Sequence, residues 1–493
     1  MKGYVLSIDQ GTTGTKALVV DPRLGVKGRG LREFPQRFPK PGQVEHDLED
    51  IWKSVVQAIR AALRDGGVKA KEIVAIGITN QRETTALWSR GTGAAVAPAI
   101  VWQDRRTAAR CRQLQEEGLE GEVRRRTGLV VDPYFSATKL EWLLRNVRGA
   151  AAKARKGELA FGTIDSFLVH RFTGGEAHVT DVSNASRTML MDLEKMEWDR
   201  RMLDVFGVPS PVLPEIRGSS EVVGETRGVP GLPDGIPIAG LAGDQQAALF
   251  GQACFDVGDS KCTYGTGAFL LMNVGAKPVP SKAGLLSTVA WMLGGGERAY
   301  ALEGCSFTAG ASVQWLRDGL GIIGTAAEVE SLARSVPDSR GLTFVPALAG
   351  LGAPHWRPEA RGLIAGIDRG VTSAHLARAV LEGIALEIMD LAEAMEKDAG
   401  RRIGAFTVDG GACENDLLLQ IQSDLLRVPV VRPRMVETTA LGAACLAGLA
   451  VGFWGSKEEI RKASRPDRVL RPRMAPRARR ELVDRWRVAV AKA

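Results

Sequence analysis

Apolar and polar residues follow two patterns along the chain, and these predict helices and strands. An apolar residue recurs every three or four positions across residues 47–63, which is typical of an amphipathic helix from Asp47 to Leu63. Short apolar runs without charge predict strands at Tyr4–Ile8, Ala17–Val20, Ile73–Thr79, Ile238–Ala242 and Phe406–Val408. A longer helix is expected to be capped by Ser373 and to end just before Gly400. This alternation of strands and helices indicates an α/β fold.

The chain is too long for a single hydrophobic core. It has 493 residues, whereas single cores stop growing near ~250–300 residues. A stretch rich in Gly, Pro and Ser at 217–237 precedes a strand, so a domain boundary is expected near residues 217–260. We predict a first domain over 1–248, a second over 249–455 and a basic C-terminal tail over 456–493.

A turn made of glycine and threonine occurs once in each half of the chain. Asp9-Gln10-Gly11-Thr12-Thr13-Gly14 follows the first strand, and Tyr264-Gly265-Thr266-Gly267 lies between two later apolar runs. Glycine lets a backbone approach phosphate closely, and threonine adds hydroxyl donors. A carboxylate at Asp9 can hold Mg²⁺ through its waters. Two such turns across a cleft would hold a triphosphate from both sides, while each alone also fits an ordinary β-hairpin.

Composition argues against several classes of protein. The six cysteines form no CxxC pair, which is typical of reduced thiols in a cytoplasmic protein and not of disulfides or zinc ligands. Asp9 interrupts the first apolar run, so no signal peptide is expected. The longest uncharged run, 438–456, is rich in Ala and Gly, and we expect a packed interior helix there, not a membrane span.

The net positive charge is confined to the C-terminal tail. Residues 461–487 hold ten Arg, one Lys and three acids, which accounts for the whole net charge of +8. A nucleic-acid-binding protein would spread basic residues along a groove and interleave them with aromatics. We therefore expect no nucleic-acid partner and interpret the tail as a solvated terminal helix preceded by a loop.

Polar residues directly after predicted strands are candidates for chemistry. Arg82 and Glu83 follow the strand at 73–79, where a donor fork and an acceptor could together hold neighbouring hydroxyls of a polyol. Asp244 follows the strand at 238–242 and could serve as a general base. The alternatives are a surface ion pair for the first two residues and a helix cap for Asp244.

Two further features have both a functional and a structural interpretation. The glycine pair in 409–415 follows a strand, and a flat ring or a phosphate could lie against it. The same segment could instead be a tight turn capped by Asn415. Trp102 and Phe269 could form an apolar wall for a carbon skeleton, or they could belong to the core.

Together these motifs resemble the glycerol kinases of the FGGY carbohydrate kinase family, in the actin-like ATPase superfamily. The runs at 80–85 and 243–251 are the most specific to that group. The matching segments occur in family order: Asp9–Thr13, Asn80–Thr85, Ile100–Arg106, Asp132–Ser136, Asn184–Leu190, Gly243–Phe250, Tyr264–Gly267, Gly310–Asp318, Gly350–Pro354 and Asp409–Asn415. The resemblance implies two RNase H-like domains, each a mixed sheet flanked by helices, around a central cleft.

The resemblance also implies a reaction and a set of sites. ATP would phosphorylate glycerol to sn-glycerol 3-phosphate in glycerol catabolism, with Asp244 as general base and Asp9 holding Mg²⁺ through water. Glycerol would contact Arg82, Glu83, Trp102, Tyr134, Asp244, Gln245 and Phe269. The nucleotide would contact Thr12, Thr13, Gly14, Lys16, Thr266, Gly310, Gln314, Gly411 and Asn415. A cytoplasmic homodimer or homotetramer is expected.

Two other functions stay open from the sequence. A sibling kinase of xylulose, ribulose or another polyol would share these motifs, because the size of the pocket cannot be seen in a sequence. A silent sugar sensor would have lost Asp9 or Asp244, and both are present. The segment 226–233 lacks the Gly-Gly-Lys-Gly-Gly-Thr loop that binds fructose 1,6-bisphosphate in enteric relatives, so that inhibition is not expected.

Overall fold

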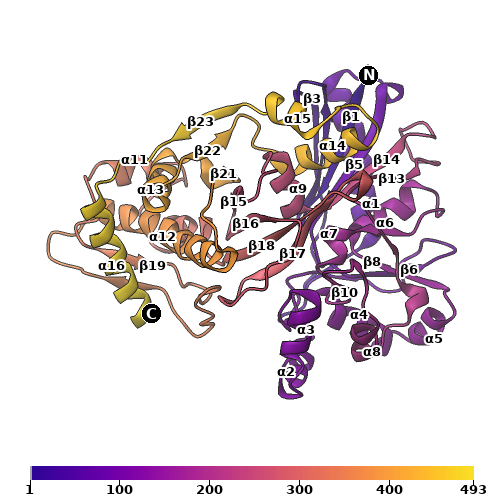
Figure 1. Ribbon diagram of the computed structural model, residues 1–493, viewed down its shortest axis with the longest axis horizontal. Helices are drawn as coiled ribbons and strands as arrows, with labels where there is room; N and C mark the ends of the chain where they lie inside the picture. Colours follow the sequence, from indigo (N-terminus) through magenta and orange to yellow (C-terminus); the bar gives the residue numbers. More distant parts are fainter. Residues whose placement is uncertain (1–2) are drawn as a thin grey trace.

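Two lobes, each built on a mixed β-sheet, make up the computed structural model, which describes residues 3–493 (Figure 1). The first sheet has the strand order β13-β14-β5-β1-β2-β3. Its strands are β1 (Tyr4–Gln10), β2 (Gly14–Val20), β3 (Val26–Glu33), β5 (Ile73–Asn80), β13 (Ser220–Glu225) and β14 (Pro237–Gly243). β1, β5 and β14 run parallel, and the other pairings are antiparallel.

The second sheet repeats this topology with one additional strand. Its order is β17-β18-β16-β15-β21-β22-β23. Its strands are β15 (Ser260–Tyr264), β16 (Ala268–Gly275), β17 (Leu286–Met292), β18 (Arg298–Ser306), β21 (Phe406–Asp409), β22 (Val430–Pro433) and β23 (Pro466–Leu470). In both sheets an antiparallel hairpin is followed by parallel strands and then by an antiparallel edge strand. The α/β fold expected from the sequence, with its repeated hairpin, is confirmed.

Helices cover both faces of the first sheet. α1 (Leu48–Gly66), capped by Asp47, and α6 (Ile164–Phe172) share a core with Leu6 and Ile78 on one face. α14 (Thr438–Ala450) covers the other face and lies very close to it. A Cβ on Gly77 would come within 2.1 Å of the carbonyl oxygen of Ala443. Small residues on the strand and on the helix therefore allow this contact.

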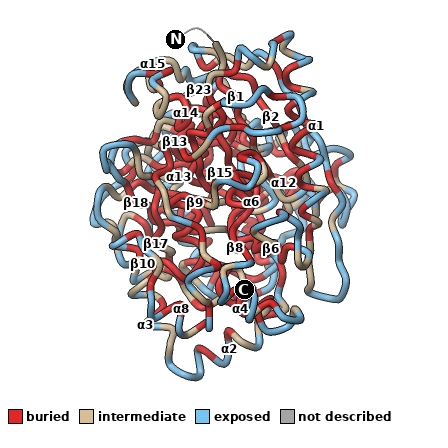
Figure 2. Tube along the Cα trace, turned by 90° about the vertical axis from the view of Figure 1, so that its right-hand side faces the viewer, coloured by how far each residue is buried: buried red, intermediate tan, exposed pale blue. Residues whose placement is uncertain are grey.

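The two lobes meet through a pair of buried helices. α9 (Asp244–Gly251) packs against α14, and their core includes Leu271 and Trp291 from the second sheet. In Figure 2 buried residues fill the interior of the molecule, whereas exposed residues lie mostly at its periphery. The interior helix expected in the uncharged run is therefore confirmed. Within residues 3–493, no helix has both the length and the apolar character needed to cross a membrane.

The C-terminal tail is part of the fold. β23 forms the edge of the second sheet, and α16 (Pro476–Lys492) buries Leu482, Val483 and Trp486 in the core of the second lobe. α15 (Lys457–Ala463) instead buries Ile460 in the core between the lobes. The interpretation as a solvated helix after a loop is wrong, because one face of α16 is apolar and becomes buried.

The expected domain boundary stays a prediction, and one helix cap needs correction. The boundary was expected near residues 217–260, and the stretch 217–237 within that range contains β13, which pairs with β14 inside the first sheet. Glycine and proline there form the turns around an edge strand. The long helix α12 (Ser373–Ala399) ends before Gly400 as expected, but its N-cap is Thr372, and Ser373 is its first helical residue.

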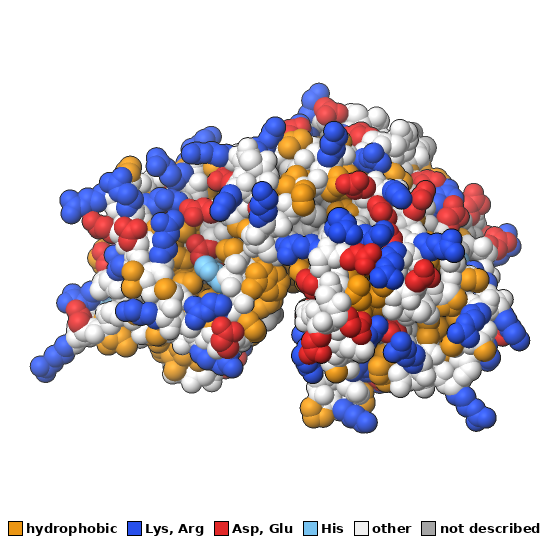
Figure 3. All heavy atoms as spheres, turned by 60° about the horizontal axis from the view of Figure 1, so that its bottom comes forward, with side chains coloured by type: hydrophobic (Ala, Val, Ile, Leu, Met, Phe, Trp, Pro, Cys, Tyr) orange, Lys and Arg blue, Asp and Glu red, His pale blue; other side chains and the backbone are white. Residues whose placement is uncertain are grey.

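Shorter elements complete the two lobes. In the first lobe these are α2 (Ala108–Glu116), α3 (Glu120–Thr127), α4 (Ser136–Asn146), α5 (Ala150–Arg155), α7 (Val182–Ala185), α8 (Arg200–Phe206), β4 (Glu45–His46), β6 (Ala86–Ser89), β7 (Ala99–Ile100), β8 (Leu159–Gly162), β9 (Val179–Asp181), β10 (Met191–Asp192), β11 (Glu197–Trp198) and β12 (Glu215–Arg217). In the second lobe they are α10 (Gly310–Gln314), α11 (Glu328–Arg334), α13 (Asp416–Leu426), β19 (Thr343–Val345) and β20 (Leu363–Ala365). Figure 3 shows a deep notch between the lobes.

Candidate active site

Three parallel strands of the first sheet end at the same level. In the strand register Gln10 of β1 and Gly243 of β14 both lie opposite Asn80 of β5. The segments that follow these three strands therefore emerge side by side. They carry the first Gly-Thr turn, the pair Arg82–Glu83 and the start of α9, so the topology brings together residues far apart in sequence.

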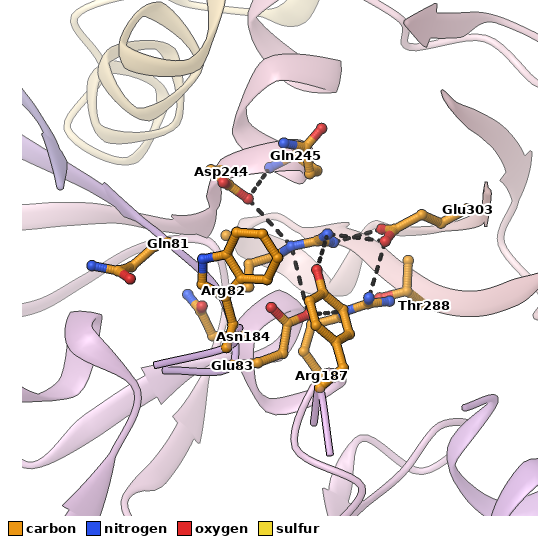
Figure 4. Close-up of polar contacts among 12 residues, drawn as sticks. Gln81, Arg82, Glu83, Asn184, Arg187, Asp244, Gln245, Thr288 and Glu303 are labelled. Carbon is orange, nitrogen blue, oxygen red and sulfur yellow. Dashed lines mark hydrogen bonds and ion pairs between the residues drawn. The ribbon is translucent and has the colours of Figure 1, made fainter. Parts of the chain in front are cut away.

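Arg82 is the centre of the polar contacts at this edge (Figure 4). Its Nε lies 3.2 Å from Oδ1 of Asp244, and its Nη2 lies 3.4 Å from the hydroxyl of Tyr134. Nη2 also donates to Glu303 Oε1 at 2.9 Å. Only 2% of the Arg82 side chain is exposed, so its charge is balanced by these partners and not by water.

Glu83 lies beside Arg82 in a backbone conformation that is rare for glutamate. Its φ is +61°, and its side chain is 1% exposed. Oε1 of Glu83 accepts a hydrogen bond of 2.7 Å from Nε of Arg187. Residues held in such strained conformations cluster at functional sites. The surface-pair interpretation of Arg82 and Glu83 is therefore wrong, since both are buried.

Asp244 and Gln245 form the first turn of α9. The Asp244 side chain is 32% exposed, and Oδ1 accepts a hydrogen bond from the backbone N–H of Gln245. Gly243 is the N-cap, so Asp244 does not act as the cap. Burial raises the pKa of the Asp244 carboxyl, and the charges of Arg82 and Lys261 oppose that shift. A partly exposed carboxylate with a raised pKa fits a general base.

Trp102 and Tyr134 form an aromatic wall next to Arg82. Their rings meet edge to face, with centroids 5.6 Å apart. The indole Nε1 of Trp102 donates to Oγ1 of Thr12 at 2.9 Å, which connects this wall to the first Gly-Thr turn. Phe269 lies on β16, half-buried, and pairs in register with Thr263 and Cys305.

The first Gly-Thr turn places opposite charges near the strand ends. Asp9 and Lys16 are register partners on β1 and β2, and Lys16 forms an ion pair with Glu437. The backbone N–H of Gly11 closes the turn by donating to Gly14 at 2.9 Å. Burial raises the pKa of Asp9 to about 7. Lys16 opposes this shift, while Asp244 and Glu437 add to it.

The second Gly-Thr turn packs against the start of α10. The N–H of Gly310 donates to the carbonyl oxygen of Gly265 at 2.9 Å, and the carbonyl oxygen of Thr266 accepts from Ala309. A Cβ on Gly310 would lie 2.6 Å from the Gly265 oxygen, so only glycine fits there. Gln314 ends the same helix and is exposed. Thr266, Gly310 and Gln314 are thus brought together.

Gly411 and Asn415 lie at the end of β21, which pairs with β15. Gly411 is exposed, and a Cβ added to it would meet no atom within 4 Å. Asn415 caps α13, with its Oδ1 accepting from the N–H of Leu418 at 2.9 Å. The cap interpretation of Asn415 is confirmed, and its side-chain NH₂ group can still donate to a ligand.

Three buried charged residues at the site were not predicted from the sequence. Arg187 and Glu303 contact Arg82 or Glu83, and Lys261 contacts Gln245 Oε1 and, at 2.8 Å, Thr263 Oγ1. The available signal was a charged residue inside an apolar strand, as in Ala-Leu-Glu-Gly at 301–304. Such a residue is buried only if it is paired.

Two family models match consecutive parts of the chain. The N-terminal domain of the FGGY family of carbohydrate kinases matches residues 4–251, and its C-terminal domain matches residues 260–451. The chain belongs to the FGGY family of carbohydrate kinases. The two glycine-threonine turns of this FGGY chain lie one in each matched domain.

Full-length relatives of this FGGY kinase carry a more specific name. The glycerol kinase of Myxococcus xanthus is 62% identical over 491 residues, which cover 99% of each chain. The glycerol kinase of Bdellovibrio bacteriovorus is 52% identical and covers 100% of this chain and 99% of its own. The crystal structure of Plasmodium falciparum glycerol kinase with ADP superposes with a TM-score of 0.94 at 36% identity, covering 100% and 98% of the two chains.

Proposed function

We propose that this FGGY kinase transfers the γ-phosphoryl group of ATP to a terminal hydroxyl of glycerol, giving sn-glycerol 3-phosphate. The observation that carries the proposal is the convergence of Arg82, Glu83 and Asp244 at the ends of two strands, beside an aromatic wall. Relatives named glycerol kinase over the full length of the chain support the choice of substrate.

The geometry suits a small polyol. The guanidinium of Arg82 and the carboxylate of Glu83 offer donors and an acceptor to adjacent hydroxyls, and Trp102 and Tyr134 offer an apolar surface to the carbons. The carboxylate of Asp244 takes the proton from the attacking hydroxyl as the new P–O bond forms and the bond to ADP breaks. Positioning and charge stabilisation supply most of the acceleration in such transfers.

The nucleotide is assigned to the second lobe and to both Gly-Thr turns. In this proposal Thr12, Thr13, Gly14, Lys16 and Thr266 contact the phosphates, and Gly310, Gln314, Gly411 and Asn415 contact the remainder. Closure of the cleft around both substrates would exclude water as a competing acceptor. The relative solved with ADP supports a nucleotide as the second substrate.

The surroundings of Asp9 fit Mg²⁺. Asp9 is near two further carboxylates, Asp244 and Glu437, and this concentration of negative charge favours a divalent cation. Within residues 3–493, no group of three or more acidic, His or Cys side chains could hold a metal alone, so Asp9 would act through water and the nucleotide phosphates. When bound, Mg²⁺ neutralises charge on the phosphates.

The cellular setting is also a proposal. All six cysteines are free, and five of them are buried, which supports a reducing compartment such as the cytoplasm, where ATP is available.

The oligomeric state, a homodimer or homotetramer, stays a prediction, which light scattering on the purified protein would test. We also propose that residues 466–492 of the basic segment 456–493 belong to the second domain, because β23 and α16 complete its sheet and core.

Product analysis tests the reaction directly. The purified protein would be incubated with glycerol, Mg²⁺ and ATP, and the product followed by ³¹P NMR and by a dehydrogenase specific for sn-glycerol 3-phosphate. We expect one phosphomonoester that the dehydrogenase oxidises, and roughly 10²–10⁴-fold slower product formation with Asp244→Asn. A product that the dehydrogenase rejects, or ADP binding without any phosphoester, would refute the proposal.

A further inference from the structure

Four buried charged side chains form a closed ring at the candidate glycerol site (Figure 4). Glu303 accepts from Arg82 Nη1 at 2.5 Å and Nη2 at 2.9 Å, and from Arg187 Nη2 at 2.9 Å. Arg187 Nε donates to Glu83 at 2.7 Å, and Glu83 Oε1 lies 3.8 Å from Arg82 Nε. None of the four side chains is more than 2% exposed.

The ring joins the two lobes. Arg82, Glu83 and Arg187 come from segments around the first sheet, whereas Glu303 lies on β18 of the second sheet. Two arginines and two glutamates balance in charge, so each buried ion has an opposite partner. Removing one partner would leave another buried charge uncompensated, because all four side chains are almost fully shielded from solvent.

The ring also determines which nitrogens of Arg82 remain available to other groups. Both terminal nitrogens donate to Glu303, and their remaining N–H groups face Gln246 and Tyr134, so Asp244 contacts Nε alone. Without Glu303, the guanidinium could turn its terminal nitrogens toward the nearest remaining carboxylate. That carboxylate would be Asp244, which would then be held in a bidentate pair and be less available to a hydroxyl.

We propose that Glu303 is a positioning residue for phosphoryl transfer: through Arg82 it keeps the carboxylate of Asp244 free to accept a proton, and through Arg187 it holds Glu83 toward the substrate. In this proposal Glu303 contacts neither the attacking hydroxyl oxygen nor the phosphorus that is transferred. The inference rests on the proposed function, since it assumes that Asp244 and Glu83 contact the polyol. Arg187 and Glu303, which had no role predicted from the sequence, thereby gain one.

Glu303→Gln tests the proposal, because it keeps the side-chain volume and removes the charge. We expect the KM for glycerol to rise roughly tenfold to a hundredfold, while the KM for ATP stays within a factor of two to three. Glu387→Gln is the matched control, since Glu387 is a buried glutamate of the same lobe on α12 that makes no contact with Arg82. It should leave both KM values unchanged. Thermal unfolding and ADP binding would show that each variant is folded.

The pH profile distinguishes positioning from a merely structural role. The charged groups that act on Asp244 are Arg82, Lys261, Glu303 and Asp9. Glu303 raises the pKa of Asp244 while Arg82 lowers it, so losing Glu303 should move the acid limb of kcat/KM to lower pH. Glu303→Asp keeps the charge, so its KM for glycerol and its acid limb should lie closer to the wild-type values than those of Glu303→Gln.

Two results would overturn the proposal. One is unchanged glycerol kinetics in Glu303→Gln. The other is an equal rise in the KM values for glycerol and for ATP with an unchanged acid limb of kcat/KM. That result would indicate that Glu303 has only a structural role. Wild-type turnover in the same assay tests the proposed function separately, and if another polyol is preferred, the same variants are compared on that polyol.

Discussion

Nε of Arg82 lies 3.2 Å from Oδ1 of Asp244, so the side chain proposed to orient a hydroxyl also contacts the one proposed to accept its proton. Arg82 follows β5 and Asp244 follows β14, two adjacent parallel strands. The sheet register therefore determines their separation. Because register is set by the buried faces of the sheet, packing in the core and the geometry of catalysis are directly linked.

Asp244→Asn should abolish most of the turnover without unfolding the protein. The amide keeps the shape of the side chain but cannot accept the proton, and general bases contribute roughly 10²–10⁴-fold to rate. We expect kcat to fall within that range while calorimetry shows ADP binding close to that of the wild type. A variant that keeps full activity would show that Asp244 is not the base.

Activity should fall at acid pH with a midpoint above the ordinary aspartate range. Burial raises the pKa of Asp244 above 3.8, and only the ionised carboxylate can accept a proton. kcat/KM should therefore rise with pH through this pKa and then level off. A series of kcat/KM measurements at different pH values with saturating Mg-ATP gives the midpoint of this rise. A midpoint below pH 3.8 would contradict the assignment of Asp244 as the general base.

Gly310→Ala should weaken nucleotide binding selectively. The added methyl would lie 2.6 Å from the carbonyl oxygen of Gly265 and push α10 away from the second Gly-Thr turn. The KM for ATP should rise several-fold with little change for glycerol. Gly121→Ala is the control, because a Cβ there meets no atom within 4 Å. Equal effects on both substrates would argue against a nucleotide contact at this turn.

Glu387→Gln should stabilise the protein at alkaline pH. Burial raises the pKa of Glu387 from 4.5 to about 8, so the native state retains a proton that the unfolded chain loses above pH 4.5. Wild-type stability should therefore fall between pH 4.5 and 8, by at most about 5 kcal/mol. Urea unfolding of both proteins at several pH values measures this, and the free energy of unfolding of the variant should not fall over that range. If the free energies of the two proteins change in parallel with pH, Glu387 ionises normally.

Trp486→Ala should destabilise the second lobe. The indole is fully buried, and its Nε1 donates to Asp390 at 2.8 Å. Removing a buried tryptophan costs about 3–5 kcal/mol. Val488→Ala, which changes a 57% exposed neighbour, should change stability by less than about 0.5 kcal/mol. Similar stabilities for both variants would mean that α16 contributes little to the core.

Local patterns in the sequence predicted much of the fold. The strand at 73–79, the helix at 47–63 and the repeated hairpin are evident because burial imposes periods of two and 3.6 residues on the chain. The edge strands were missed. β13 lies in a stretch rich in glycine and proline, and the residues of β23 are mostly exposed, so neither carries a clear apolar signal.

The site was predictable only in part. Arg82, Glu83 and Asp244 were candidates because they follow predicted strands, and the structure brings the three side chains together. Glu303 and Arg187 could not be assigned, since their roles depend on contacts more than 100 positions apart in sequence. The sequence also did not predict that one face of α16 is buried, because the many arginines around Leu482, Val483 and Trp486 make the apolar periodicity of this segment difficult to recognise.

ADP release on a panel of polyols tests whether glycerol is the substrate. The purified protein would be given Mg-ATP with glycerol, dihydroxyacetone, erythritol, xylulose or ribulose in separate reactions. We expect kcat/KM to be highest for glycerol, by roughly tenfold or more over the other polyols. Highest activity on a five-carbon sugar would contradict the three-carbon site formed around Arg82 and Glu83.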